Sequence, residues 1–469
     1  MKNNAKRLLT GVTAAVMSLS AVSAADIAVL GSAISAFAED GVAINEANFP
    51  DEVFRNYISE RCDLDSNGVL SDGEIESAGF FSLESMGVSN LKGIEYFTWL
   101  YNLSCSNNQI TTLDLSKNTE LMSLSCSNNQ ISTLDLSQNT SLKWLECNNN
   151  QLTSLNLSNN TALNRLSCNG NQISSLDVSN NTALGELYCS NNQITALDVS
   201  HNTELRNLYC GENQLTSIVT SGASKLGYLS CGKNQLSSLD LSENTEFYQL
   251  DCSYNLFTSL DFSKNTELRK LSCDYNNLTS LDVSKNTELR ELSCDYNNLT
   301  SLDASKNTEL RELHCAHNNL TSLDTGNNTA LTELRCSYNN IVSLDLSNNT
   351  ALTVLKCGNN NLTSIDVTNT TLKLGTYDCD SNEYTLKTAS LDEITQYGFD
   401  GARASKWIGA KYDAQTNSLT DIKGDSVQYY YDAGNGNTVK FILKTDKISS
   451  SEPTPAPTKP VVKAEPTYG

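Results

Sequence analysis

Hydrophobic and polar positions recur every 21 residues between Leu100 and Thr371. One copy, residues 121–141, has the sequence L-M-S-L-S-C-S-N-N-Q-I-S-T-L-D-L-S-Q-N-T-S, and the next copy follows directly. There are thirteen copies, and the last is one residue short. An asparagine follows each repeated cysteine by three residues, from Asn108 to Asn360. The repeated cysteines are Cys105, Cys126, Cys147, Cys168, Cys189, Cys210, Cys231, Cys252, Cys273, Cys294, Cys315, Cys336 and Cys357.

The alternation within each copy predicts a short strand. In the segment L-x-x-L-x-C the last two apolar residues are two positions apart, so they share one face of a strand. A single copy cannot bury this face, but stacked copies form a continuous core beneath a parallel sheet. The rest of each copy returns along the outer side. It leaves little room for a full helix, so we expect extended or tightly turned backbone there.

The asparagine after each cysteine is predicted to turn the chain out of the strand. Its amide can bond backbone groups of its own and the neighbouring copy, which satisfies polar groups that stacking would bury. We interpret the cysteines as small buried apolar residues and not as redox groups. Side chains that point the same way in adjacent parallel strands suit packing better than disulfide geometry. Cys62 and Cys379 lie outside the register, and their pairing does not follow from the sequence.

The motif L-x-x-L-x-C-x-x-N-x-L resembles the leucine-rich-repeat signature and keeps its register from Leu100 to Thr371. A 21-residue length with cysteine at an apolar position is similar to the cysteine-ladder subclass of bacterial internalin-type repeats. The resemblance implies a leucine-rich-repeat solenoid over residues 100–379, with a curved parallel sheet and a mostly non-helical outer side. It also implies a surface protein used for adhesion or partner recognition, although it does not identify the partner.

Residues 63–74 have the pattern of a twelve-residue calcium-binding loop. Oxygen donors stand at the required spacing, Gly68 permits the sharp turn, and Leu70 is placed to anchor the loop on apolar neighbours. A helix is expected over Pro50 to Cys62, and a short one after the loop. The predicted ligands are Asp63, Asp65, Asn67, the carbonyl of Val69, Ser71 and Glu74.

Residues 39–99 are therefore predicted to form a helical cap that resembles an EF-hand. EF-hands usually work in pairs, and this sequence offers one loop. We expect a structural site of modest affinity, filled by extracellular calcium, that helps to cover the open first strand of the solenoid. The alternative is a degenerate loop that serves only as a helical cap.

Residues between the buried positions of each strand are expected to point outward on the concave side. Most are small in the early copies, and larger ones appear at Trp144, Tyr188 and Tyr209. In later copies an aromatic residue precedes the ladder asparagine, and a strand spacing of about 4.8 Å would set these rings in a row. This column comprises Tyr254, Tyr275, Tyr296, His317 and Tyr338. Beside it we expect Arg269, Arg290 and Arg311, then Glu291, Glu312 and Glu333, and also Asp251, Asp274 and Asp295.

An aromatic strip with flanking charge is typical of a face that binds protein or glycan. A second interpretation starts from the near identity of copies 9–11. On that interpretation the columns arose by duplication of repeat copies, and their side chains contact only the equivalent side chains of neighbouring copies. The sequence leaves both interpretations open.

No catalytic constellation accompanies the repeats, and we predict that the chain is not an enzyme. The sequence has three histidines and lacks a phosphate loop, an H-E-x-x-H motif and a Ser-His-Asp spacing. His314 and His317 flank Cys315. A metal site there would require the strand to twist, because Cys315 should face the core.

Charge and the first residues bear on location and partners. Acidic residues outnumber basic ones by 54 to 32, for a formal charge of -22. Such a surface repels phosphate, which disfavours nucleic acid and anionic membranes as partners. Residues 1–38 are predicted to be a secretion signal, with cleavage after Ala24 or Ala38. No other run approaches the ~18 apolar residues of a membrane span, so we expect no transmembrane segment in the mature chain.

The sequence changes character after the repeats. Residues 380–447 predict a small, sandwich-like β-rich domain with a hairpin at the Gly/Asn-rich segment 434–437. Residues 448–469 contain five prolines among serines and threonines and are predicted to be an extended linker. A linker normally leads to another module. Our working hypothesis is therefore an anchor, docking or catalytic module beyond residue 469.

Together these features predict a secreted or cell-surface module for recognition or adhesion. We expect a monomer that binds a protein, or alternatively a glycan, on its concave sheet, with calcium as cofactor and no nucleic-acid partner. Two other functions stay open. The chain could be an accessory binding module of a larger extracellular enzyme or complex, or a structural spacer.

Overall fold

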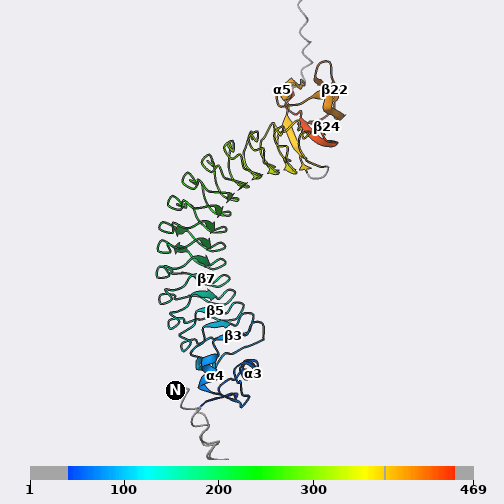
Figure 1. Cartoon of the computed structure of the whole chain (residues 1–469). Coiled ribbons are helices and arrows are strands. Elements are labelled where there is room, and N and C mark those ends of the chain that lie inside the picture. Colours follow the sequence, from blue (N-terminus) through cyan, green and yellow to red (C-terminus); the bar gives the residue numbers. More distant parts are fainter. Residues whose placement is uncertain (1–40, 374–376, 449–469) are drawn as a thin grey trace, which may run out of the picture. The chain divides into compact units, whose positions relative to one another are not determined.

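The computed structural model describes residues 41–373 and 377–448 (Figure 1). The predicted signal peptide, residues 1–38, and the linker after residue 448 lie outside the described part of the chain. None of the helices in the described part is long and apolar enough to cross a membrane. The chain divides into two compact units, residues 1–142 and 143–469, which are described in turn.

The first unit begins with two short helices joined by a loop. Helix α3 starts after Asp51, whose side chain accepts a hydrogen bond from the amide of Phe54. Helix α4 starts after Ser71, which forms a capping box with Glu74. Both helices predicted around the loop are therefore present. The elements are β1 (Val42–Ala43), α3 (Glu52–Arg61), β2 (Val69–Leu70), α4 (Asp72–Ser77), β3 (Phe80–Ser82), η1 (Ile94–Tyr96), β4 (Asn102–Ser104) and β5 (Ser123–Ser125).

An aromatic cluster joins the helices of this unit to its first strands. The ring of Phe54 lies edge-on to that of Phe81 in β3, with centroids 6.2 Å apart. Phe81 in turn packs edge-on against Phe97 at 4.7 Å, and all three rings are buried. Strand β3 pairs in parallel with β4, and β4 pairs with β5. The cap thus supplies a strand to the parallel sheet of this unit.

The second unit is built on the repeats, whose strands pair in parallel with equivalent residues opposite one another (Figure 1). Strands β9 (Ala196–Asp198) and β11 (Ser217–Val219) form a separate pair. The described backbone between the repeat strands is otherwise turns, so the predicted solenoid with a non-helical outer side is confirmed. The repeat strands are β6 (Trp144–Glu146), β7 (Arg165–Ser167), β8 (Glu186–Tyr188), β10 (Asn207–Tyr209), β12 (Tyr228–Ser230), β13 (Gln249–Asp251), β14 (Lys270–Ser272), β15 (Glu291–Ser293), β16 (Glu312–His314), β17 (Glu333–Arg335), β18 (Val354–Lys356) and β19 (Tyr377–Asp378).

Leucine and cysteine form continuous buried columns beneath the strands. In the copy that contains β15, Leu292 and Cys294 are 1% and 0% exposed, whereas Ser293 between them is half-buried. Burial raises the pKa of the ladder thiols, to about 12 for Cys126 and for Cys168. These thiols therefore stay neutral and serve as packing residues, as predicted.

The last cysteine of the ladder differs from the others. Strand β19 lies beside β18 and brings Cys379 to Cys357, with Cα atoms 4.7 Å apart and a disulfide between them. The prediction that ladder cysteines are unpaired packing residues is therefore wrong for Cys357. The closing strand supplies a second thiol on the next rung, 22 residues later, where the 21-residue register no longer applies.

The predicted asparagine ladder ties adjacent copies together. The side-chain nitrogen of Asn297 donates to the carbonyl of Cys273 in the preceding copy at 3.0 Å, and to that of Cys294 at 3.2 Å. Its side-chain oxygen accepts from the amide of Leu278 at 3.0 Å. Asn276 and its equivalents repeat this pattern. One buried amide thus satisfies three backbone groups on two copies.

A second buried asparagine column, which the sequence analysis did not identify, runs along the outer turns. The Nδ2 atom of Asn286 donates to the carbonyls of Phe262 and Asn265 at 3.1 and 2.8 Å. Within the described residues its Oδ1 atom has no hydrogen-bond partner, and the same holds for Asn307. Where threonine replaces the apolar residue 24 positions earlier, its hydroxyl fills this gap. Thr325 donates to the Oδ1 of Asn349 at 2.9 Å.

The C-terminal part of the second unit has one four-stranded sheet, in the order β20-β25-β24-β21. Strands β22 and β23 form a separate hairpin, so the described residues form a single sheet with a hairpin and not the predicted sandwich. The hairpin expected at segment 434–437 is confirmed by β24 and β25. The elements are β20 (Asn382–Thr385), α5 (Asp392–Thr395), η2 (Gly401–Arg403), β21 (Ala404–Ile408), β22 (Lys411–Asp413), β23 (Ser418–Thr420), β24 (Ser426–Gly434) and β25 (Asn437–Lys444).

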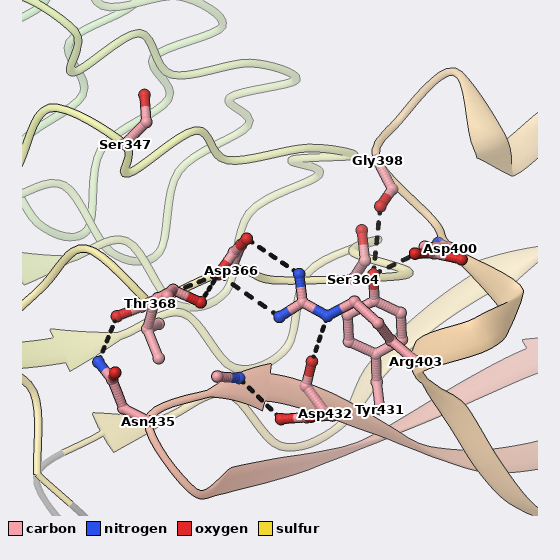
Figure 2. A network of polar contacts seen from close by, with 12 residues as sticks. Ser347, Ser364, Asp366, Thr368, Gly398, Asp400, Arg403, Tyr431, Asp432 and Asn435 are labelled. Carbon is pink, nitrogen blue, oxygen red and sulfur yellow. Dashed lines mark hydrogen bonds and ion pairs between the residues drawn. The ribbon is translucent and has the colours of Figure 1, made fainter.

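A polar network fastens this sheet to the last repeat (Figure 2). Arg403 forms an ion pair with Asp366 at 2.9 Å and donates to the carbonyl of Asp432 at 2.8 Å. Hydrogen bonding to Arg403 lowers the pKa of Asp366 to about 2. Within the turn between β24 and β25, the side chain of Asn435 donates to the carbonyl of Val367 at 2.7 Å. The last repeat and the sheet therefore share one interface.

The second asparagine column generates a stability prediction. Val283→Thr should place a hydroxyl near the unpaired Oδ1 of Asn307, whereas Thr325→Val should remove the donor to Asn349. An unpaired buried polar group costs about 1–3 kcal/mol, so Thr325→Val should lower the urea midpoint. Val283→Thr should leave the midpoint unchanged or raise it.

The matched control is Val199→Thr, because residue 223, 24 positions later and still within the register, is an alanine and offers no side-chain acceptor. This variant should lose stability through burial of an unpaired hydroxyl. Equal urea midpoints for Val283→Thr and Val199→Thr would show that the Oδ1 atoms of the buried asparagines do not accept a hydrogen bond from the new hydroxyl.

Candidate functional site

The loop between α3 and α4 brings three carboxylates together. Single oxygen atoms of Asp63, Asp65 and Glu74 all lie within 4.8 Å of one another. Asp63 and Glu74 are buried, with 6% and 7% of their surface exposed. Converging carboxylates repel one another unless a cation lies between them, so this all-oxygen donor set fits a hard divalent ion.

Hydrogen bonds within the loop hold these side chains in place. Asp63 accepts from the amides of Asn67 at 3.1 Å and Gly68 at 2.9 Å, and Gly68 has the positive φ expected of the sharp turn. Glu74 accepts from the amide of Ser71 at 2.9 Å and from its hydroxyl at 2.8 Å. The bonds from Ser71 lower the pKa of Glu74, so its carboxylate is charged at neutral pH. All the predicted side-chain ligands thus lie in one loop.

Strand β1 gives the loop a backbone partner. Val42 pairs with Leu70 and Ala43 pairs with Val69, while the amide of Ile44 donates to the carbonyl of Gly68 at 2.9 Å. Leu70 is fully buried, as predicted for the residue that anchors the loop. Strand β1 could not be predicted from the sequence, because a two-residue strand carries no periodicity.

On the repeats, the structure places three predicted aromatic residues on the strands themselves. Trp144 is the first residue of β6 and is 47% exposed. Tyr188 and Tyr209 are the last residues of β8 and β10, and their rings stack at 4.7 Å. Tyr228, which begins β12, stacks on Tyr209 at 4.5 Å. Tyr188, Tyr209 and Tyr228 form a short aromatic row on the exposed strand face, whereas Trp144 lies two strands before Tyr188.

The aromatic column of Tyr254, Tyr275, Tyr296, His317 and Tyr338 forms the predicted row. Successive rings stack at centroid distances of 4.2, 4.1, 3.9 and 4.1 Å, with interplanar angles of 10–12°. Its position differs from our expectation. Each member lies in the turn after its strand, because the strands end at the residue before the cysteine. The column therefore follows the carboxyl edge of the sheet and does not stand on the strand face.

Every residue of the aromatic column has a left-handed backbone, with φ between 52° and 56°. The same register position holds asparagine in most early copies, including Asn107, Asn128 and Asn191, with φ between 54° and 58°. Asparagine tolerates this conformation better than tyrosine does. The change from asparagine to aromatic residues in the later copies is therefore not explained by backbone preference.

The predicted arginine column lies at the opposite edge of the sheet. Arg269, Arg290 and Arg311 are exposed and precede the first residues of β14, β15 and β16. They are separated from the aromatic column by the width of the strands, so the two columns border the sheet and are not adjacent. The predicted position of the arginines beside the aromatic column is wrong, because the repeat pattern does not fix where each three-residue strand ends.

Between these edges, acidic side chains gather close to the aromatic column. Asp274 accepts from the hydroxyl of Ser293 at 2.7 Å and from the amide of Asp295 at 2.7 Å. Burial raises the pKa of Asp274, and burial together with the charge of Asp274 raises the pKa of Asp295 to about 6. Glu333 pairs with His314 at 3.2 Å. Cys315 is fully buried beside His314, so these residues do not form the alternative metal site.

A trough of about 500 Å³ lies where the aromatic column begins. Its floor is made by the residues that directly follow the ladder cysteines, and two of these are glycines in consecutive copies. The trough was not predicted from the sequence, and its one sequence signal is the pair of glycines at the same register position in consecutive copies. The floor residues are Ser190, Gly211, Gly232, Ser253 and Asp274.

Comparison with curated sequences finds a short match. A segment of 71 residues, 15% of this chain, is 36% identical to Internalin J from Listeria monocytogenes serotype 4b (strain F2365). The segment spans 8% of that protein, so what the whole relative does is not carried over from this match. No protein-family model matches the chain.

Comparison with solved structures covers much more of the chain. The functional domain of InlJ from Listeria monocytogenes, which includes a cysteine ladder, matches 87% of this chain and 99% of that domain, with a TM-score of 0.73 and 30% identity. An internalin, inlF, from the same species matches 69% of this chain and 98% of that one, with a TM-score of 0.61 and 25% identity. A Leptospira interrogans leucine-rich-repeat protein, LIC12759, is 23% identical with a TM-score of 0.55, over 59% of this chain and 76% of that one, which supports the fold alone. The register of the buried cysteines and the match to the complete InlJ domain place this chain in the internalin-type family of cysteine-ladder leucine-rich-repeat proteins.

Proposed function

We propose that this chain is a secreted or cell-surface recognition module that binds a protein partner along the aromatic column. The observation that carries the proposal is the use of aromatic residues in left-handed turns where earlier copies have asparagine. The InlJ domain and inlF share the solenoid fold with this chain, and the resemblance to internalin-type repeats, which implies a surface protein used for adhesion or partner recognition, supports the proposal.

The energetics of the column support a role beyond stability. A left-handed backbone costs a non-glycine residue roughly 1–2 kcal/mol. Each stacked pair of aromatic rings stabilises the folded state by roughly 0.5–1.5 kcal/mol. The two effects nearly cancel, so folding alone gives little reason to replace asparagine with tyrosine. The rings of Tyr254, Tyr275, Tyr296 and Tyr338 nevertheless stay 38–51% exposed, and contiguous exposed rings are typical of interfaces.

Duplication of copies does not account for the whole column. Copies 9–11 are near duplicates, but Tyr254 and Tyr338 belong to copies whose other residues differ. The cysteine is followed by S-Y-N-L-F in the first and by S-Y-N-N-I in the second. Both copies keep the aromatic residue at the same position, which favours selection of the column as a surface.

The geometry of the stack favours a protein over a glycan. Sugars pack on the flat faces of aromatic rings, but stacking at 3.9–4.2 Å covers the faces of the inner rings. What remains accessible along the column is a line of ring edges and polar tips. Such a surface suits the mixed polar and apolar side chains of a protein.

The short loop in the first unit supports a second proposal. We propose that Asp63, Asp65 and Glu74, with Asn67, Ser71 and the carbonyl of Val69, hold a structural calcium ion. The convergent, partly buried carboxylates support this assignment. The ion would stabilise the turn between α3 and α4, and hence the aromatic cluster that joins the cap to β3.

The recognition proposal predicts the effect of a double substitution. Tyr275→Asn/Tyr296→Asn restores the residue that this turn carries in earlier copies, so the fold should remain intact. Affinity for a protein partner, identified by screening the chain on protein and glycan arrays, should fall at least 10-fold. The matched control is Tyr101→Asn, which removes a ring that is 50% exposed but lies outside the column. A partner bound equally well by the double variant, or hits among glycans alone, would contradict the proposal.

The calcium proposal predicts a change in thermal stability. A ligand that binds only the folded state adds about 2.7 kcal/mol at 100 times its Kd, so calcium should raise the melting temperature of the first unit. Asp63→Asn/Glu74→Gln should abolish this increase. Asp72→Asn, which changes an exposed carboxylate of α4 outside the ligand set, should keep it. An equal calcium-dependent rise in melting temperature in both variants would contradict the proposed calcium site.

A further inference from the structure

The walls of the trough come from two different columns of the repeat. On the strand side they are Ser230, Asp251 and Ser272, which end β12, β13 and β14. On the turn side they are Glu212, Lys233, Tyr254 and Tyr275. Because equivalent residues of adjacent copies lie about 4.8 Å apart, the trough extends along the stacking direction over several copies. Its length suits an extended segment of polypeptide.

Two of the floor residues, Gly211 and Gly232, have no side chain. A β-carbon added to Gly232 would lie 3.2 Å from the carbonyl oxygen of Ser253. One added to Gly211 would lie 3.1 Å from the carbonyl oxygen of Gly232. The neighbouring register positions hold serine, aspartate or alanine, for example Ser190 and Asp274. A side chain at either glycine would therefore crowd the backbone of the next copy, and the trough keeps a backbone floor at these two positions.

One ring face of the aromatic column borders this space. Tyr254 is the first member of the column, so only one of its faces is covered, by Tyr275 at 4.2 Å. The residue before it in the register is Lys233, which forms an ion pair with Glu212 at 2.6 Å. Cation–ring contacts recorded over the described residues involve Tyr188, Tyr430 and Tyr431, and none involves Tyr254. No cation thus lies over the ring of Tyr254 among the described residues, and Lys233, which interacts with Tyr254 electrostatically, has its Nζ in the ion pair with Glu212.

The charge of the trough is unbalanced. Lys233 is the single basic residue among its lining, and Glu212 already pairs with it. Two further carboxylates, Asp251 and Asp274, line the same space, and no ion pair of either is recorded in the described part of the chain. Asp274 accepts hydrogen bonds from the hydroxyls of Ser293 and Ser272 and from the amide of Asp295, and burial raises its pKa.

We propose that the trough receives an arginine side chain from an extended segment of the protein partner, an inference that rests on the proposed recognition function. A guanidinium is planar, so it can stack on the open face of Tyr254 while its N–H groups donate to Asp251 and Asp274. Lysine supplies the charge without the plane, and an acidic or phosphorylated segment would be repelled. The chemistry of the trough therefore predicts the class of partner, which is a protein with an exposed strand or loop that carries an arginine.

The test uses the full chain and three synthetic pentapeptides, acetyl-Gly-Arg-Gly-Arg-Gly-amide and its lysine and citrulline counterparts. Citrulline has nearly the shape of arginine but carries no charge. Isothermal titration should show 1:1 binding of the arginine peptide, weakened at least 10-fold by citrulline and less strongly by lysine. Equal binding of the arginine and citrulline peptides, or no binding of the arginine peptide, would overturn the proposal.

Substitutions that follow the repeat's own precedents locate the binding. Ser230→Tyr places in the trough a side chain that the equivalent positions Tyr188 and Tyr209 already carry, so it should fill the space without unfolding the chain. Ser104→Tyr makes the same change at the equivalent position of β4, outside the trough. Ser230→Tyr and Asp251→Asn/Asp274→Asn should each weaken the arginine peptide at least 10-fold, and Ser104→Tyr should leave its affinity unchanged. Retained affinity in Ser230→Tyr would overturn the proposal.

The two sets of variants distinguish the proposed arginine pocket from the proposed recognition surface. If Tyr275→Asn/Tyr296→Asn loses a protein partner while Ser230→Tyr keeps it, the column binds the partner and the arginine pocket is wrong. If both variants keep the partner, the recognition surface itself is misplaced. Loss of the partner in both variants, together with the arginine peptide result, supports both proposals.

Discussion

Constant spacing is the constraint on which the rest of the structure depends. Because each copy is 21 residues long, equivalent residues of neighbouring copies lie one strand apart, and every position becomes a column. Each residue of a buried column must then pack against, or form hydrogen bonds with, the equivalent residues of the neighbouring copies. Leucine and cysteine satisfy this by packing, and the ladder asparagine satisfies it by bonding backbone groups on two copies at once. Asn297, for example, holds two carbonyls and one amide.

The same constraint separates structure from recognition. Buried columns can hardly vary, because one misfit interrupts the stack, whereas exposed columns are free to change. The left-handed turn after each strand is such a column. It accepts asparagine, glycine, glutamate, lysine, tyrosine and histidine with almost the same φ, for example in Asn191, Gly170 and Tyr296. A surface can therefore be built there without altering the core, and the aromatic column and trough occupy adjacent parts of it.

Much of this could be predicted from the sequence, because the 21-residue period determines which residues of neighbouring copies lie next to one another. The 21-residue register gave the buried role of Cys294, the bonds of the ladder asparagines and the row of rings from Tyr254 to Tyr338. What it could not give was the end of each strand. With strands of three residues, a shift of two positions moves Tyr275 from the strand face to the edge of the sheet, and places Arg269 at the opposite edge. The Cys357–Cys379 disulfide was also out of reach, because it forms where the register stops. The trough has backbone as its floor at Gly211 and Gly232. Two glycines hardly change the pattern of hydrophobic and polar positions, so that pattern does not reveal the trough.

The central claim is that recognition takes place at the turns on the carboxyl edge of the later copies. Hydrogen–deuterium exchange on the full chain, with and without a bound protein partner, tests it most directly. The account predicts protection at residues 211–212, 232–233, 253–254 and 274–275 and onward along the aromatic column, with no change in the outer turns such as residues 262–265. Protection confined to the outer turns, or to residues 404–444 of the C-terminal sheet, would contradict it.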